Sequence, residues 1–180
     1  EDVLREFEAH PEADGILFSV ESLNPDRPLI KIKKFAKVRR REALKYGCAR
    51  LAVRREKVIY NNISFSLLFG GGAKYGSGED TLFLQDCLRA GLKIYKSPIK
   101  VVDVSQENST WFEGYTDKYF TDKGALFAAA LPRLCYIYAF LSALKKKYNN
   151  RKKSEIFKLY LKGIREYKQL RKGGYNNLNK

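Results

Sequence analysis

The segment from Gly70 to Asp80, GGGAKYGSGED, stands directly before an apolar run. Five of its first nine residues are glycine, which favours an irregular loop because glycine adopts backbone conformations that other residues avoid. Thr81 to Ala90 then shows helical spacing of its apolar residues, and Gly91 provides a C-terminal stop. The pattern therefore predicts a loop that feeds a helix, with Glu79 and Asp80 in the first helical turn.

Two roles are open for Glu79 and Asp80. Acidic residues are common in the first turn of a helix, where they complement the macrodipole and bond free backbone N–H groups. The preceding glycines also keep side-chain bulk away, so a carboxylate here could take a proton from a hydroxyl nucleophile that approaches closely. The loop matches no phosphate-binding pattern. The P-loop pattern needs a lysine directly after a glycine and then Ser or Thr, but Ala73 separates Lys74 from Gly72 and Tyr75 follows.

The N-terminal two thirds of the chain alternates between helical and strand-like patterns. Asp2 to His10 has helical spacing, and Ala13 to Glu21 reads as a buried strand. A short basic helix is expected over residues 36 to 47, ending at Gly47. Further strands are expected at Leu29 to Phe35, Ala49 to Arg54, Leu92 to Tyr95 and Ile99 to Val104, the last two on either side of Pro98. Such alternation predicts the α/β class.

From Tyr115 onward the sequence is helical in character. Ala125 to Leu144 is almost entirely apolar, but Pro132 and Arg133 interrupt it. A spanning helix needs about 20 predominantly apolar residues, so a kinked helix pair on a core or on a bilayer surface is expected instead. Residues 152 to 172 combine an apolar stripe with many lysines, which is the pattern of a basic amphipathic helix.

The positive charge is concentrated in two blocks. Residues 31–60 contain 12 basic and 2 acidic side chains, and residues 141–180 contain 13 and 2. Nucleic acid is one candidate partner, but no nucleic-acid-binding motif accompanies the charge. An anionic membrane surface accounts for more of the pattern, because Lys145 to Lys147 directly follow the apolar segment. A solvated helical face is the remaining reading.

Cysteine and methionine usage bears on the setting of the chain. Cys48, Cys87 and Cys135 are odd in number and show no metal-binding spacing, which argues against a disulfide framework or a zinc site and favours a reducing cytosol. The chain contains no methionine, so we expect position 1 to lie inside a longer protein.

The run Gly76 to Tyr95, GSGEDTLFLQDCLRAGLKIY, resembles the "ED" motif of family 2 glycosyltransferases, in which an acidic pair opens a helix that Ala-Gly-Leu and a strand follow. Three further segments agree: EFEAHPEADGILFSVES at residues 6–22, CARLAVRREKVI at residues 48–59 and NSTWF at residues 108–112. The resemblance covers about residues 1 to 140.

The resemblance implies a GT-A fold, an α/β sandwich around a mostly parallel sheet. Residues 1–114 would be the C-terminal portion of the catalytic domain. Residues 115–180 are expected to be an all-helical basic extension, and its apolar and basic pattern, not the resemblance, predicts association with a membrane. The implied activity is inverting transfer of a sugar from a nucleotide-activated donor to an acceptor hydroxyl, in cell-surface polysaccharide or glycolipid assembly. Asp80 would be the general base, and Glu79 would shape the acceptor site. The other residues expected to bind the acceptor are Lys74, Gly76, Gly78, Thr110 and Trp111.

A divalent cation, Mg²⁺ or Mn²⁺, is expected on the donor diphosphate of the complete enzyme. The chain has no Asp-x-Asp triplet, and relatives carry a histidine near the residues that here are Val104 to Gln106, whereas the only histidine is His10. We therefore expect the metal ligands to lie upstream of Glu1 and these 180 residues alone to be inactive. Measurable sugar transfer by the 180 residues would refute that expectation. The competing interpretation is a non-catalytic basic module that binds nucleic acid or an anionic membrane.

Overall fold

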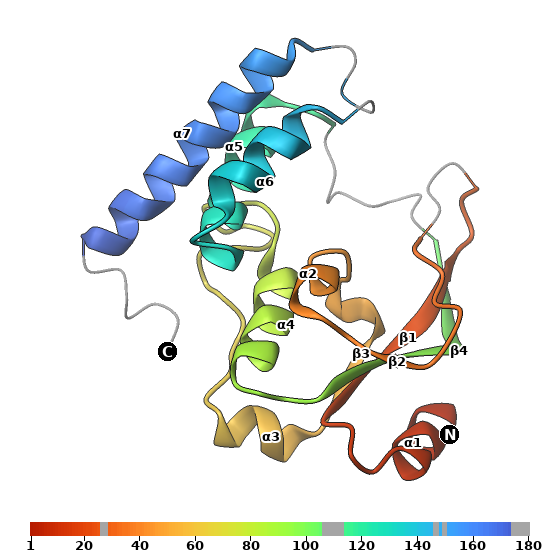
Figure 1. Cartoon of the computed structure of the whole chain (residues 1–180). Helices are drawn as coiled ribbons and strands as arrows, with labels where there is room; N and C mark the ends of the chain where they lie inside the picture. The colour runs from red at the N-terminus through yellow and green to blue at the C-terminus, as the bar shows by residue number, and fades with distance from the viewer. Residues whose placement is uncertain (26–28, 106–113, 146–147, 149–150, 174–180) are drawn as a thin grey trace. The chain divides into compact units, whose positions relative to one another are not determined.

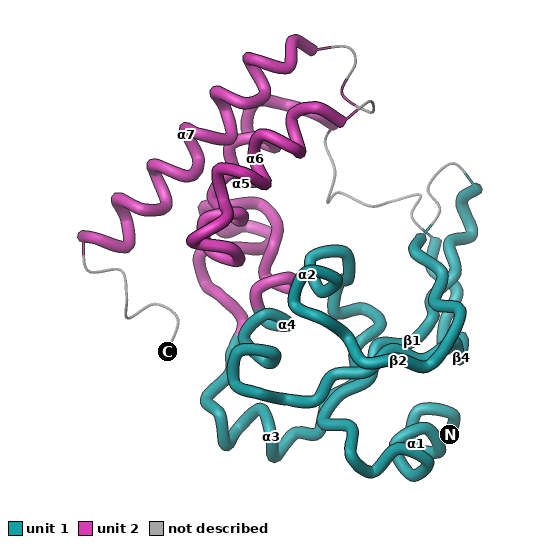
Figure 2. Tube along the Cα trace, viewed as in Figure 1, with its two compact units in different colours: residues 1–64, 83–109 teal, residues 65–82, 110–180 magenta. Residues whose placement is uncertain are grey.

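The structure is a computed structural model that describes residues 1–25, 29–105, 114–145, 148 and 151–173. These residues form a mixed α/β arrangement with an open four-stranded mixed sheet and seven α-helices (Figure 1). The chain divides into two compact units (Figure 2): unit 1 contains residues 1–64 and 83–109, and unit 2 contains residues 65–82 and 110–180. The predicted domain division at residue 114 stays a prediction.

The sheet of unit 1 has the strand order β2-β4-β1-β3. β1 (Gly15–Ser22) and β4 (Ile94–Val104) pair in parallel, whereas β3 (Leu51–Val53) and β2 (Ala36–Lys37) are antiparallel edge strands on β1 and β4. The α/β class is confirmed, and the sheet is mixed because a single pair among its three is parallel. β1 is central and its first six residues are buried, which explains its almost unbroken apolar sequence.

β4 continues through Pro98 as one strand, so the prediction of two separate strands was wrong. The pairing of β1 with β4 changes register here: Leu17 lies opposite Lys96, but Ser19 lies opposite Lys100. The extra residues on β4 form an irregularity, in which the Ile99 N–H donates to Ser97 Oγ at 3.2 Å. A proline is tolerated at such a bulge because no ladder hydrogen bond is required of it.

The prediction for residues 29–47 was also wrong in part. Residues 29–35 form no strand, and the expected basic helix is reduced to the four-residue α2 (Arg40–Ala43). Ile32 is buried, but Leu29 and Ile30 are exposed, so the alternation of apolar and basic residues does not produce a half-buried strand.

Two helices cover opposite faces of the sheet in unit 1. α4 (Glu79–Arg89) packs Phe83, Leu84 and Cys87 into a core with Leu17 and Ile94. α1 (Asp2–Ala9) packs against the other face, where Ile16 and Phe18 are buried. Successive β1 side chains point to opposite faces, so one strand serves both cores. The short helices η1 (Cys48–Arg50) and α3 (Arg55–Tyr60) flank β3 in the sequence.

Unit 2 is built on α5 (Asp117–Ala130), α6 (Cys135–Ala143) and α7 (Lys153–Lys172). α5 ends before Pro132 and α6 begins after it, as the sequence predicted. α5 and α7 approach through glycines: a Cβ at Gly124 would lie 2.2 Å from the Tyr160 carbonyl oxygen, and one at Gly163 would lie 1.8 Å from that of Thr121. Among the described helices, none is long and apolar enough to cross a bilayer.

Candidate functional site

The glycine-rich loop closes on itself. The Gly70 N–H donates to the Tyr75 carbonyl at 2.9 Å, and the Tyr75 N–H donates to the Leu68 carbonyl at 3.0 Å. Gly70 and Gly78 both have φ of +122°, a conformation that side chains other than glycine rarely adopt. The loop that precedes α4 therefore has a defined shape that depends on its glycines.

Glu79 is engaged in holding this loop. It is the first residue of α4, and its Oε2 accepts a hydrogen bond from the Gly78 N–H at 2.8 Å. Its Cδ lies 3.2 Å from the position that a Cβ at Gly70 would occupy. The carboxylate thus sits against both ends of the glycine-rich segment, which favours a positioning role for Glu79 over direct chemistry.

Asp80 occupies a different position from its neighbour. It is the second residue of α4 and is partly exposed, whereas Leu82 and Phe83 after it turn into the interior. The first turn begins with the hydrogen bond from the Leu82 N–H to the Gly78 carbonyl, 3.0 Å long. Both carboxylates of the acidic pair therefore lie on partly exposed residues, and Glu79 is the one whose hydrogen bond to the loop backbone is described.

Side chains of α5 hydrogen-bond to the backbone of the loop. Asp122 Oδ2 accepts from the Gly76 N–H at 2.8 Å and from Lys118 Nζ at 2.6 Å, and Lys118 Nζ also donates to the Lys74 carbonyl at 3.2 Å. A Cβ at Gly78 would lie 2.8 Å from Leu126 Cδ1. Gly78 is thus required for close packing on α5, a structural reason for glycine that is independent of any acceptor, whereas a Cβ at Gly76 would make only an ordinary contact with Asp122 Oδ2 at 3.5 Å.

An aromatic cluster lies beneath the loop, and the sequence analysis did not identify it. The Tyr75 ring is 1% exposed, and its centroid lies 4.8 Å from that of Phe69 and 6.3 Å from that of Tyr167 on α7. Its buried hydroxyl has no hydrogen-bond partner among the described residues, and burial raises the pKa of Tyr75 to about 12. An aromatic residue inside a glycine-rich loop is the sequence signal that could have indicated this anchor.

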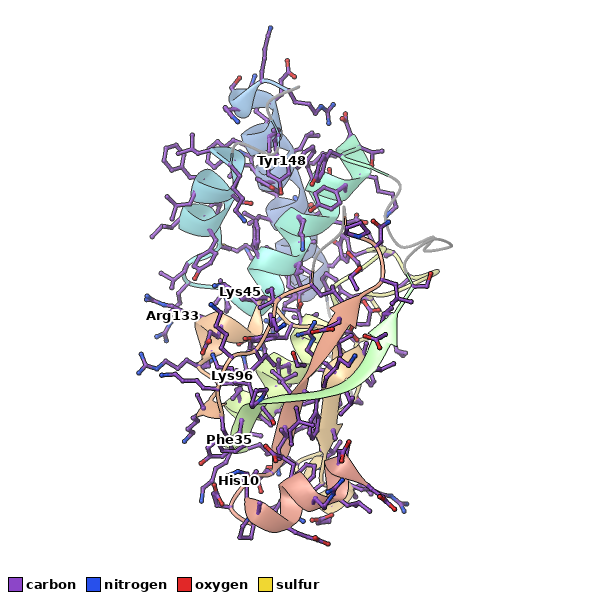
Figure 3. All side chains as sticks on the ribbon, turned by 90° about the vertical axis from the view of Figure 1, so that its right-hand side faces the viewer. His10, Phe35, Lys45, Lys96, Arg133 and Tyr148 are labelled. Carbon is purple, nitrogen blue, oxygen red and sulfur yellow. The ribbon has the colours of Figure 1, made fainter. Side chains whose placement is uncertain are left out.

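The remaining predicted site residues fall in different places. Lys74 is exposed and lines an open surface pocket of about 310 Å³ with four residues at the end of α7: Glu166, Gln169, Leu170 and Gly173. Thr110 and Trp111 lie outside the described residues. His10, in unit 1, stacks on Phe35 with ring centroids 3.6 Å apart (Figure 3). The structure thus gathers Lys74, Gly76, Gly78 and the acidic pair in unit 2.

Metal binding has no support from the part of the chain that the structure describes. There, no three side chains of His, Cys, Asp or Glu come together as a ligand set. Cys48, Cys87 and Cys135 are free thiols, and burial raises the pKa of Cys87 to about 12.

Comparison with known proteins adds no relative: no protein-family model matches the chain, and no curated protein sequence matches it significantly. The resemblance at residues 76–95 and the geometry of the loop and α4 are therefore the features of this chain that bear on its function. The class that the fold itself defines is mixed α/β, with one unit that contains the sheet and a second unit built on helices.

Proposed function

We propose that this chain is the acceptor-side portion of an inverting glycosyltransferase of the GT-A type, in which Asp80 is the general base. The proposal depends mainly on the surroundings of the two acidic side chains, Glu79 and Asp80. Glu79 is bonded to the loop backbone, while Asp80 stands next to it on the first turn of α4 with part of its surface accessible. The "ED" resemblance implies that Asp80 is the base and that Glu79 shapes the acceptor site.

The proposed reaction transfers a sugar to an acceptor hydroxyl. The hydroxyl oxygen attacks the anomeric carbon of the donor sugar, its proton passes to the Asp80 carboxylate, and the bond between the anomeric carbon and the donor phosphate oxygen breaks. A base can act only within about 3 Å of the proton it accepts, so the loop must place the acceptor precisely. Glu79 and Asp122 serve this step by fixing the loop backbone at Gly78 and Gly76.

The partners of this reaction are a nucleotide-sugar donor and a saccharide or lipid-linked acceptor, with the enzyme placed in the cytoplasm at the inner face of the plasma membrane. Lys74, Thr110 and Trp111 stay assigned to the acceptor by resemblance. Mg²⁺ or Mn²⁺ belongs to the complete enzyme, and since the described residues lack a ligand set for it, no step assigned to this chain uses the cation.

Substitution of Asp80 tests the proposal in the longer protein that includes the upstream half. We expect Asp80→Asn to lower transfer by about 10²–10⁴-fold, the range that general-base catalysis contributes, with the midpoint of thermal unfolding unchanged. Transfer is measured as release of the nucleoside diphosphate across a panel of nucleotide sugars. Asp86→Asn is the matched control, because Asp86 lies on the same helix in an exposed pair with Arg89.

The alternative role of the pair gives the opposite result. If Asp80 only stabilises the helix start, Asp80→Asn lowers the unfolding midpoint and leaves transfer intact. We expect that pattern of lost stability for Glu79→Gln, because a neutral amide oxygen is a weaker acceptor for the Gly78 N–H.

The competing function, a non-catalytic basic module, stays open on the charge alone. Residues 115–180 contain 16 Lys and Arg against 4 Asp and Glu. Retention on nucleic acid by a longer protein that lacks any transfer activity would favour this module.

A further inference from the structure

α6 exposes a continuous face of large apolar side chains. Five residues on the helix or directly after it are between 46% and 57% exposed: Tyr136, Ile137, Phe140, Leu141 and Leu144. Their spacing of one, three and four residues places them on one side of the helix. Contiguous apolar surfaces of this kind mark interaction sites more often than isolated exposed residues do.

The opposite side of α6 is fully used by the fold of unit 2. Cys135, Ala139, Ser142 and Ala143 are buried there, and Ser142 Oγ lies 3.1 Å from the Tyr160 hydroxyl of α7. α6 therefore presents its small residues to the interior and its large ones to the outside. An apolar face that folding does not use lowers the solubility of the protein. We therefore expect this face of α6 to bind a partner.

α7 does not supply this surface, although its sequence predicted an amphipathic anchor. Its apolar stripe is buried, with Ile156, Tyr160 and Ile164 at 0% exposure. Gly163 brings this stripe against the backbone of α5. α7 therefore adds positive charge to unit 2, while the exposed apolar surface belongs to α6.

Basic side chains surround the face of α6. Arg133 precedes the helix and Lys145 follows it, and both are exposed; Figure 3 labels Arg133, which extends outward. On the flank, Lys168 of α7 places its Nζ 4.5 Å from the centroid of the Tyr136 ring. The apolar face thus has a cation at each end and one along its side.

The acidic residues of α5 and α7 do not oppose this rim. Phe157 and Lys168, which contact α6, lie on one side of α7. Glu155 and Glu166 are eleven positions apart, or about three turns, and so share the opposite side of that helix. On α5, Asp117 pairs with Arg151 and Asp122 with Lys118.

We infer that the exposed face of α6 docks unit 2 onto an anionic phospholipid bilayer. Aromatic and aliphatic side chains enter the boundary between headgroups and acyl chains, while Arg133, Lys145 and Lys168 meet the phosphates. A second copy of the chain is a poorer occupant, because pairing two such faces would bring like-charged rims together. The inference is independent of sugar transfer, since it is tested with no donor or acceptor present.

The test is sedimentation of the 180-residue protein with vesicles. We expect binding to vesicles of equal parts phosphatidylcholine and phosphatidylglycerol, weaker binding as salt rises, and little binding to pure phosphatidylcholine. The double variant Ile137→Gln, Phe140→Gln should lose at least about tenfold in binding with its helical circular dichroism intact. Ile59→Gln with Tyr60→Gln, two exposed apolar residues on α3, is the matched control and should bind like the parent protein.

A second variant separates the contribution of charge to vesicle binding from that of the apolar side chains. Arg133→Ser with Lys145→Ser should weaken binding to the anionic vesicles by about fivefold for each charge removed. Equal binding by the α6 variant and the parent would overturn the inference, as would a parent protein that ignores the vesicles. A parent dimer that the α6 variant abolishes would show that a second copy covers this face, and would equally overturn it.

Discussion

α6 and α7 belong to the same unit and each contains eight apolar residues. α7 buries its large apolar residues, whereas α6 exposes them. The stripe on α7 faces α5, where glycines on both helices allow backbone contact, and its large residues are buried. α6 packs through alanine, serine and cysteine, and its large residues face outward. The difference shows that an apolar stripe becomes core only where a neighbouring element of matching shape meets it.

The largest expected effect compares one isoleucine on each helix. Ile156→Ala on α7 should lower the free energy of unfolding by about 2–5 kcal/mol, because it leaves a cavity at a fully buried position. Ile137→Ala on α6, where the side chain is 56% exposed, should change it by less than about 0.5 kcal/mol. Urea titrations followed by circular dichroism measure both, and equal losses would show that α6 is part of the core.

The close contact of α5 with α7 gives the next effect. Gly163→Ala should destabilise the protein by about 1–3 kcal/mol, because the new methyl group would meet the Thr121 carbonyl and force the helices apart. Helix propensity alone predicts the opposite sign, a gain of about 1 kcal/mol. Gly71→Ala is the control, since its Cβ would meet no atom within 4 Å. A stabilised Gly163→Ala in the same urea titration would contradict the tight packing.

The smallest effect concerns the link between α6 and α7. Ser142→Ala should cost about 1 kcal/mol, because the buried Tyr160 hydroxyl loses one of its hydrogen-bond partners. Ser154→Ala, at an exposed position near the start of α7, should have no measurable effect. Thermal unfolding compares the two, and matching midpoints would mean that this hydrogen bond adds nothing to the docking of α6.

Local patterns predicted several elements correctly. The helix that begins at the acidic pair, the buried β1 strand and the break at Pro132 all appear in the structure, because each depends on residues near one another in the sequence. The predictions failed at residues 29–35 and at Pro98. There the outcome depends on which side chains reach the core and on a register shift against β1, and neither is encoded locally.

The candidate site shows the same limit. The sequence indicated the acidic pair and its glycine loop, but treated the two carboxylates and the glycines as groups of equivalent residues. In the structure, residues of the loop differ in their contacts with distant parts of the chain. The Gly76 N–H donates to Asp122 of α5, and the Tyr75 ring lies near that of Tyr167 on α7. These contacts join positions 46 and 92 residues apart, beyond the reach of any local pattern.

The sequence by itself determined the α/β class, the loop that feeds α4 and the apolar, basic character of the C-terminal helices, since composition and periodicity act over one or two turns. Tertiary structure alone decided that Asp122 holds the loop at Gly76, that the apolar stripe of α7 is buried and that the large residues of α6 remain exposed. Which face of a helix is covered depends on how closely another backbone can approach it, and that distance is set at Gly124 and Gly163 by elements separated in the chain.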